Sequence, residues 1–259
     1  IVFALKGVGM HGIWIAGESV DTGHVRTIVS PADLEPVAQV AEAGVEHVDL
    51  AVERAREFFD GGGWEDESGE RRRRVLLECA RLLRAHKEEM AVLDARCNGM
   101  PIGIARGEVD ASCRYLEHFA NLSTLPPERS CEQDERSCVR YEPVGVVGAI
   151  LPWNLPLLMA VWRLSPSVAA GNATILKPSS LTPLTALRLA ELFGQAGCPD
   201  GALSVLSGAG EVVGEHLASS QGVDKLTFTG STETGKRVMG LASANLKRLT
   251  LECGGKGAN

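Results

Sequence analysis

Between residues 144 and 253 the sequence alternates short, continuous apolar runs with longer amphipathic segments. The runs GVVGAIL, NATILKP, ALSVLSG, KLTFTG and LKRLTLEC have the length and apolar character of buried β-strands, and segments with helical spacing separate them. A β-α-β-α-β-α-β-α-β order within one sheet means parallel strands with right-handed crossovers. The pattern therefore predicts a doubly wound α/β fold.

Three amphipathic helices are expected before residue 144. VEHVDLAVERAREFF ends at the glycines 61–63, the second helix covers about Glu70 to Arg96, and the third about Gly107 to Leu122. HGIWIAGESV predicts a short hairpin, followed by a loop at Ser30–Pro31. The polar, then alternating, SCEQDERSCVRYEP predicts an exposed pair of strands outside the core.

Composition narrows the possible partners. The 259 residues have a net charge of −7, which provides no basic surface for nucleic acid. The one dense basic run, Arg71 to Arg74, opens a segment with helical apolar spacing, so we expect a solvated helix face. The apolar stretches are too short to cross a bilayer, and the start does not resemble a signal peptide. We expect a cytoplasmic protein, whose natural start was removed or lies upstream because residue 1 is not methionine.

The seven cysteines and six histidines show no metal-binding pattern. CxxC, HxxxH and HExxH are all absent from the sequence. The number of cysteines is odd, and several, such as Cys79, lie at apolar positions of a predicted helix. This usage is typical of reduced thiols that pack as small hydrophobic side chains in the cytosol. We therefore expect no metal site.

Polar residues and glycines follow four of the predicted strands, at the ends where open α/β sheets bind ligands. The four segments are Pro152-Trp153-Asn154, Lys177-Pro178-Ser179-Ser180, Ser207-Gly208-Ala209-Gly210 and Thr229-Gly230-Ser231-Thr232.

FTGSTETG is the most informative of these segments, because it turns a buried strand into the N-terminus of a helix. Free backbone N–H groups and the helix dipole suit a phosphate there, and Gly230 allows close approach. The spacing is neither the dinucleotide fingerprint G-x-G-x-x-G nor a P-loop, and ordinary capping of a core helix is the competing interpretation. Four such ends in one sheet favour a nucleotide site.

Two side chains at these ends have specific chemical uses. Lys177 ends an apolar strand, so it either extends to the sheet edge or supplies a cation for ribose hydroxyls or a phosphate, and its neighbours favour the cation. The amide of Asn154 is placed to donate to an oxyanion, whereas Trp153 is also compatible with simple packing.

Together, LPWNLP, GNATILKPSSLTPLTALRLAEL, VDKLTFTGSTETGKRV and NLKRLTLECGGK resemble the NAD(P)-dependent aldehyde dehydrogenase superfamily. The resemblance extends back through NGMPI and WIAGE and covers nearly the whole chain. It implies a Rossmann-like sheet, and oxidation of an aldehyde to a carboxylic acid by way of a cysteine thiohemiacetal and thioester. In this scheme Asn154 matches the oxyanion donor, and Glu252 matches the base that activates water.

The resemblance also implies a cofactor site. Lys177 matches the lysine at the adenosine ribose, and Gly230 with Ser231 matches the turn at the pyrophosphate. The other expected cofactor-binding residues are Leu151, Pro152, Trp153, Ser179, Ser180, Gly210, Gly214, Phe228 and Thr229. Many NAD-preferring members have a glutamate where this chain has Ser180, and a serine does not repel a 2′-phosphate. We expect NAD or NADP, with NADP accepted.

The resemblance divides the chain into helices that pack on the cofactor domain (1–124), an oligomerisation arm (125–143), a dinucleotide-binding domain (144–252) and the start of a catalytic domain (253–259). The family's nucleophilic cysteine follows the base in a separate catalytic domain. We therefore expect an N-terminal, cofactor-binding half that is inactive alone, from a homodimeric or homotetrameric parent. Cys253 follows Glu252 on a strand, so their side chains point to opposite faces, and we expect Cys253 to be a packed hydrophobe.

Two other functions remain open at this point. A relative that transfers the acyl group to coenzyme A would need no base for its thiol acceptor, so Glu252 favours hydrolysis. A catalytically inactive nucleotide-binding fragment is the alternative of a different class. The apolar helix after Asn154 is only a partial wall for a substrate and does not identify the aldehyde.

Overall fold

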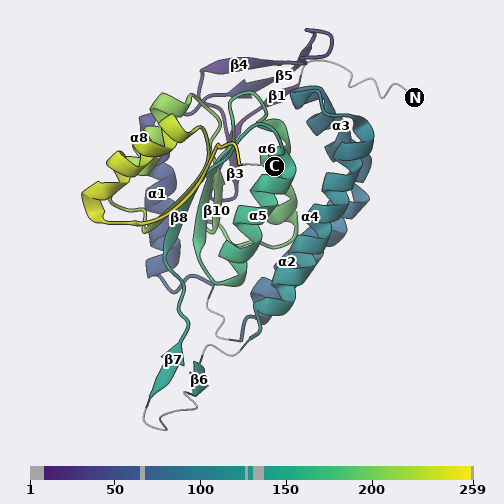
Figure 1. Cartoon of the computed structure of the whole chain (residues 1–259). Helices are drawn as coiled ribbons and strands as arrows, with labels where there is room; N and C mark the ends of the chain where they lie inside the picture. Colours follow the sequence, from purple (N-terminus) through teal and green to yellow (C-terminus); the bar gives the residue numbers. More distant parts are fainter. Residues whose placement is uncertain (1–8, 65–67, 126–127, 131–136, 258–259) are drawn as a thin grey trace.

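The computed structural model describes residues 9–64, 68–125, 128–130 and 137–257. Its centre is a seven-stranded sheet in the order β12-β11-β8-β9-β10-β2-β3 (Figure 1). The first five are parallel: β8 (Val146–Ile150), β9 (Ala173–Lys177), β10 (Leu203–Val205), β11 (Lys225–Gly230) and β12 (Arg248–Cys253). The predicted parallel α/β sheet is confirmed.

The predicted hairpin extends this sheet on the far side of β10. It consists of β2 (Ile13–Ile15) and β3 (Glu18–Val20), which are antiparallel, and β2 is also antiparallel to β10. The sequence predicts the hairpin but not its place in the main sheet. Part of the segment 1–124 therefore shares a sheet with residues 144–252, and the boundaries of the expected domains stay predictions.

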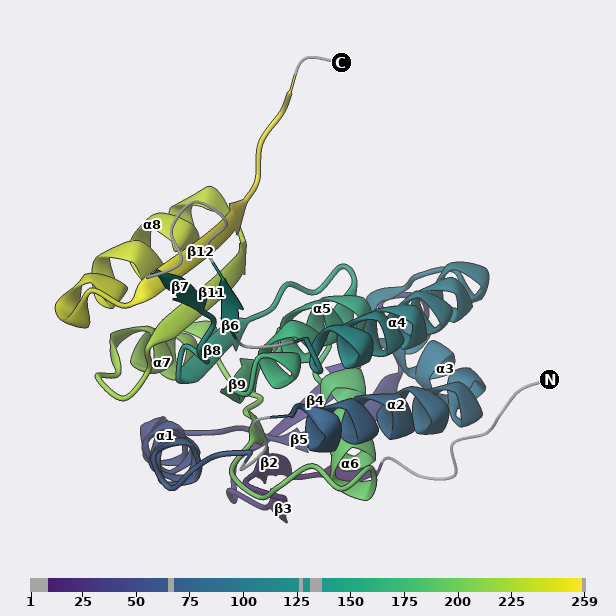
Figure 2. The same ribbon diagram turned by 90° about the horizontal axis from the view of Figure 1, so that it is seen from below.

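Helices cover both faces of the sheet (Figure 2). One face carries α5 (Pro156–Ala169) and α6 (Leu184–Gln195), on which α2 (Glu70–Ala85), α3 (Lys87–Asn98) and α4 (Ile102–Leu122) pack. The other face carries α1 (Val45–Asp60), η1 (Gly210–Gly214), α7 (Glu215–Ser219) and α8 (Thr232–Ala242), which η2 (Ser243–Asn245) follows. Neighbouring residues of β9 serve the two faces: Leu176 lies in the core under α5 and α6, and Ile175 in the core under α1.

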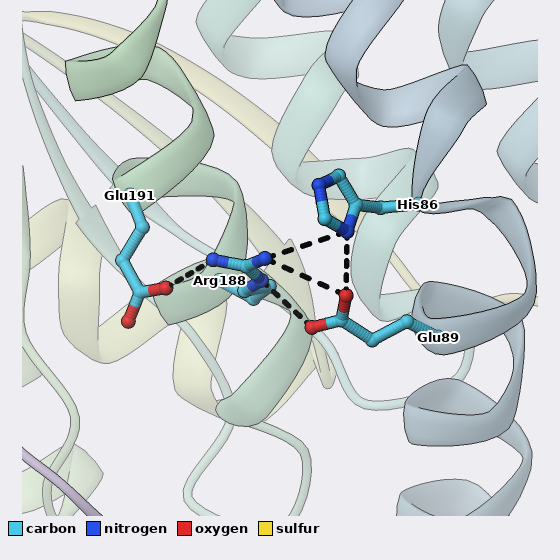
Figure 3. A network of polar contacts seen from close by, with 4 residues as sticks. All are labelled: His86, Glu89, Arg188 and Glu191. Atoms are coloured by element: carbon cyan, nitrogen blue, oxygen red, sulfur yellow. Dashed lines mark hydrogen bonds and ion pairs between the residues drawn. The ribbon is translucent and has the colours of Figure 1, made fainter.

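The segment predicted as one helix from Glu70 to Arg96 is two helices that meet at His86. The His86 Nδ1 atom lies 2.7 Å from Glu89 Oε2, and Arg188 of α6 donates from Nε to Glu89 Oε1 at 2.8 Å (Figure 3). Arg188 also donates to Glu191 at 2.6 Å, so this polar network ties the junction to α6. The prediction of one helix was wrong because apolar spacing continues across the break, whereas Arg188, which contacts both His86 and Glu89, is distant in the sequence.

Helix α4 begins at Ile102, more than one turn before the predicted start at Gly107. A Cβ at Gly103 or Gly107 would meet no atom within 4 Å, so both glycines lie on the open side of the helix. Ala105 between them is fully buried. Packing of this buried face therefore outweighs the low helix propensity of the glycines.

Two smaller sheets complete the described structure. A three-stranded sheet of β1 (Met10–His11), β5 (Pro36–Ala41) and β4 (Val25–Val29) was not predicted. The expected exposed strand pair is present as β6 (Glu128–Ser130) and β7 (Cys138–Arg140), which project from the body (Figure 1). Residues 131–136, within that expected segment, lie outside the described residues. Among the described residues, no helix has the length and apolar character needed to cross a membrane.

Candidate active site

The carboxyl ends of the five parallel strands lie along one edge of the sheet. Ile150 of β8 pairs with Lys177 of β9 on one side and with Phe228 of β11 on the other. Further along β11, Thr229 pairs with Glu252 of β12. Because this register aligns the strand ends, it brings the segments that follow the strands to the same edge, where doubly wound folds bind ligands.

Glu252 lies on the side of the sheet that α5 covers. Arg163 of α5 donates from Nη2 to Oγ1 of Thr229 at 2.9 Å, and Thr229 is the register partner of Glu252. Burial lowers the pKa of Arg163, and the charge of Glu252 opposes that shift. The exposed Glu252 carboxylate is therefore accessible to water and lies near the cation of Arg163. Sequence reasoning missed Arg163, because no local pattern connects it to residues so distant in the chain.

Asn154 lies in the loop between β8 and α5 and is exposed. Its backbone carbonyl and that of Trp153 accept hydrogen bonds from Asn98 Nδ2, at 3.2 and 3.5 Å. Among the described residues no hydrogen bond engages the side-chain amide of Asn154, which leaves both N–H groups available to a ligand. Trp153 is 55% exposed, so simple core packing does not explain it. The loop therefore presents an aromatic surface and an amide donor side by side.

Lys177 is a buried cation with incomplete hydrogen bonding. Its side chain is 4% exposed, and within the described residues its Nζ makes one hydrogen bond, to the carbonyl of Pro178 at 3.0 Å. Burial lowers the pKa of Lys177 to about 8; Arg26 adds to this effect and Glu42 opposes it. An ammonium group has three N–H donors, so Lys177 can bind hydroxyl or phosphate oxygens. Gly214 lies beside it, since a Cβ at Gly214 would be 3.8 Å from Lys177 Cδ.

The turn from β11 into α8 has the geometry of an anion site. Ser231 is the N-cap of α8, and its Oγ accepts from the backbone N–H of Thr234 at 3.1 Å. The remaining N–H groups of the first turn point out of the helix, as at any helix N-terminus. A Cβ at Gly230 would lie 2.5 Å from Cζ of Phe228, so the ring fills the space beneath the turn. Phe228 is 3% exposed, and its ring supports the turn from the core side.

The remaining predicted cofactor residues also lie in the segments that follow these strands. Leu151 is buried and Pro152 half-buried directly after β8. After β9, the Oγ of Ser179 accepts the backbone N–H two residues ahead at 3.3 Å, and Ser180 is half-buried in the same turn. Gly210 is exposed at the start of η1, with no atom near the position of a Cβ. The structure brings these residues to one edge, and their individual roles stay predictions.

No described cysteine has an exposed thiol on the face of the sheet that carries Glu252. Burial raises the pKa of Cys97 to about 12 and that of Cys113 to about 11, so both stay protonated at neutral pH. Cys253 alternates with Glu252 on β12 and lies against α8, where a Cβ at Gly235 would be 2.6 Å from its Sγ. Cys253 is nevertheless exposed, so the expected packing covers only one side of it. Within the described residues, no group of three or more His, Cys, Asp or Glu side chains is arranged to hold a metal ion.

The aldehyde dehydrogenase family model matches residues 14–259 of this sequence. Betaine aldehyde dehydrogenase of Bacillus subtilis (strain 168) is 38% identical over 251 residues, which are 96% of this chain and 51% of the relative. NADP/NAD-dependent aldehyde dehydrogenase PuuC of Escherichia coli (strain K12) is 39% identical, over 95% of this chain and 51% of its own length.

Solved structures agree with these relatives. An NAD+ complex of aldehyde dehydrogenase from Bacillus cereus superposes with a TM-score of 0.92 at 35% identity, covering 96% of this chain and 52% of that one. The doubly wound sheet defines a class of protein that binds its ligands at this carboxyl edge. Within that class, the chain belongs to the aldehyde dehydrogenase family, and it spans about half the length of the relatives it matches.

Proposed function

We propose that this chain provides the cofactor site, the oxyanion donor and the general base of an enzyme that oxidises an aldehyde to a carboxylic acid with NAD or NADP. The observation that supports this most is the common edge. The loop with the free amide of Asn154 and the exposed carboxylate of Glu252 both border this edge. The buried, incompletely bonded Lys177 ends β9 at the same edge, with its side chain beside Gly214 on the other face of the sheet. Membership of the aldehyde dehydrogenase family supports the reaction class.

In the proposed mechanism the side chains act in sequence. A cysteine thiolate attacks the aldehyde carbonyl, and we assign it to the other half of the parent protein, because the chain spans about half the length of its relatives. Asn154 donates from its amide to the oxygen as negative charge develops there. Loss of hydride then gives a thioester, and Glu252 accepts a proton from the water that hydrolyses it. Arg163 donates to Thr229, the strand neighbour of Glu252, and lies near the Glu252 carboxylate.

The residues at this edge fit a nicotinamide dinucleotide, which accepts the hydride when bound. Lys177 has N–H donors left for ribose hydroxyls, and the N-terminus of α8 after Gly230 suits a pyrophosphate. Ser180 carries no charge, and Arg26 lies near enough to Lys177 to lower its pKa. A site with these cations and without a carboxylate at Ser180 accepts the 2′-phosphate of NADP.

The remaining parts of the proposal concern the parent enzyme. We assign it a small-molecule aldehyde as substrate, a cytoplasmic location, and assembly into a homodimer or homotetramer through the strand pair β6–β7. The choice of hydrolysis over transfer to coenzyme A depends on Glu252, because a thiol acceptor needs no general base. A fragment that binds dinucleotide without turnover is the outcome expected when the chain acts alone.

Pre-steady-state kinetics of the complete parent enzyme test this mechanism. Glu252→Gln should keep the rapid burst of reduced cofactor, because hydride transfer precedes hydrolysis, and should lower steady-state turnover by roughly 100-fold or more. Asn154→Ala should instead slow the burst itself, by about 100-fold. Glu53→Gln makes the same chemical change at an exposed position of α1 and should alter neither phase. Unchanged turnover in Glu252→Gln would remove the general base from the proposal.

A further inference from the structure

The end of α3 holds Asn98 in a fixed orientation. Gly99 ends the helix in the left-handed conformation, with φ 78°, and its N–H donates to Ala95 O at 3.0 Å. The Oδ1 atom of Asn98 then accepts the backbone N–H of Met100 at 2.8 Å. With Oδ1 bound to a donor, the Nδ2 group of the same amide must point the other way.

That Nδ2 group reaches a loop more than fifty positions further along the chain. It donates to the backbone carbonyl of Asn154 at 3.2 Å and, more weakly, to that of Trp153 at 3.5 Å. Carbonyl oxygens only accept, so an amide turned around at Asn98 would face oxygen with oxygen on one side and N–H with N–H on the other. The two contacts therefore select one rotamer of Asn98 and one course of the loop.

Asp94 lies one turn earlier on the same helix. Its side chain is fully buried, and Oδ1 accepts the hydroxyl of Thr185 at 2.8 Å. The backbone N–H of Leu157, in the first turn of α5, favours the ionised carboxylate, but burial is the larger effect and raises the pKa of Asp94 to about 7. The hydrogen bond between Asp94 and Thr185 ties α3, which carries Asn98, to α6.

We propose that Asn98 is a positioning residue for Asn154, holding the backbone of its loop so that its side-chain amide points at the reacting oxygen. This inference rests on the proposed role of Asn154 as oxyanion donor. Asn98 does not touch the reacting atoms and acts through the backbone carbonyls of Trp153 and Asn154. An oxyanion donor stabilises the transition state only when it is already aimed, so small displacements of the loop lower the rate strongly.

Asn98→Asp isolates the contact to the loop. An aspartate keeps the oxygen that accepts from Met100 and so preserves the end of α3, but it cannot donate to the carbonyls of Trp153 and Asn154. Asn245→Asp is the matched control: Asn245 Nδ2 likewise donates to two backbone carbonyls, those of Gln221 and Val223, both at 3.2 Å. That control is at the opposite, amino end of β11 and β12.

The first measurement is backbone hydrogen exchange in residues 153–157, which needs no activity. Asn98→Asp should speed exchange there by about tenfold, a loss of about 1.4 kcal/mol of local stability, while Asn245→Asp leaves this segment unchanged. Equal exchange in wild type and Asn98→Asp would overturn the inference. This result does not depend on whether Asn154 is catalytic.

The second measurement is a double-mutant comparison in the complete parent enzyme. Asn98→Asp should lower kcat by about 10- to 100-fold with little change in the KM for the cofactor. In an Asn154→Ala background the same substitution should have no further effect on kcat, because it acts through Asn154. An equal loss in both backgrounds would show that Asn98 does not act through Asn154. An unchanged kcat in Asn154→Ala alone would refute the proposed function instead. The exchange data would still test the contact between Asn98 and the loop.

Discussion

Glu108 makes the pH dependence of folding a sensitive test of the core around α3 and α4. This residue of α4 is 5% exposed, and within the described residues neither carboxylate oxygen has a hydrogen-bond partner. Burial, and secondly the charge of Asp94, raise the pKa of Glu108 to about 7. Burial also raises the pKa of Asp94 to about 7, against the hydrogen bonds from Thr185 and the Leu157 backbone. The folded protein therefore holds protons here that the unfolded chain releases.

The sign and size of the effect follow from linkage. Glu108 has an ordinary pKa of 4.5 when unfolded and about 7 when folded. Stability is unaffected by this group below pH 4.5, falls as pH rises from 4.5 to 7, and is lowest above pH 7. The slope is at most about 1.4 kcal/mol per pH unit for each such group, so Glu108 alone accounts for roughly 3 kcal/mol across the window.

Equilibrium urea unfolding at several pH values between 5 and 7 measures this slope. Glu108→Gln removes one of the two groups that bind a proton on folding, so its slope should be about half that of wild type. Glu117→Gln is the control, on the same helix but with its carboxylate paired to Arg84 near the surface at 2.7 Å, and should keep the wild-type slope. A Glu108→Gln slope equal to that of wild type would refute the reasoning, because the carboxyl would then be ionised in the folded core.

Two substitutions test the cofactor site by calorimetric titration. Ser180→Glu should weaken NADP binding more than about tenfold and leave NAD binding nearly unchanged, because a carboxylate repels the 2′-phosphate. If the wild-type protein binds NAD at least tenfold more tightly than NADP, this account is contradicted. Lys177→Met keeps the apolar stem and removes the ammonium group, and should weaken both dinucleotides by about 10- to 100-fold, the range expected for a charged hydrogen bond. Equal affinity of Lys177→Met and wild type would place the cofactor elsewhere.

The strand–helix order after residue 144 was predictable because each parallel strand is buried on both faces and reads as a continuous apolar run. Lys177 was recognisable for the same reason, since a charge at the end of such a run needs a partner. The hairpin of β2 and β3 was predictable from its local pattern, whereas its pairing with β10 depends on residues almost two hundred positions away. Pairing partners of edge strands have no local signature.

The residues that sequence reasoning missed act through contacts between distant elements. Arg163 reads as an ordinary polar position of an amphipathic helix, and only the fold places it against Thr229. Asn98 reads as a helix end before Gly99, which is correct, but its second contact with the loop at Asn154 is visible only in three dimensions. The contact of His86 with Arg188, across the interface with α6, is likewise visible only in the fold. Local chemistry identifies candidate residues, and tertiary contacts decide what positions them.

The most direct test of the central claim is backbone hydrogen exchange of the chain with and without saturating NADP. A cofactor that lies over the carboxyl edge should protect the segments after the strands, residues 151–154, 178–181, 207–210 and 229–232. It should leave the turns at the amino edge, residues 170–172 and 198–202, unchanged. Protection at the amino edge, or no protection in any segment, would contradict the assignment of this edge as the dinucleotide site.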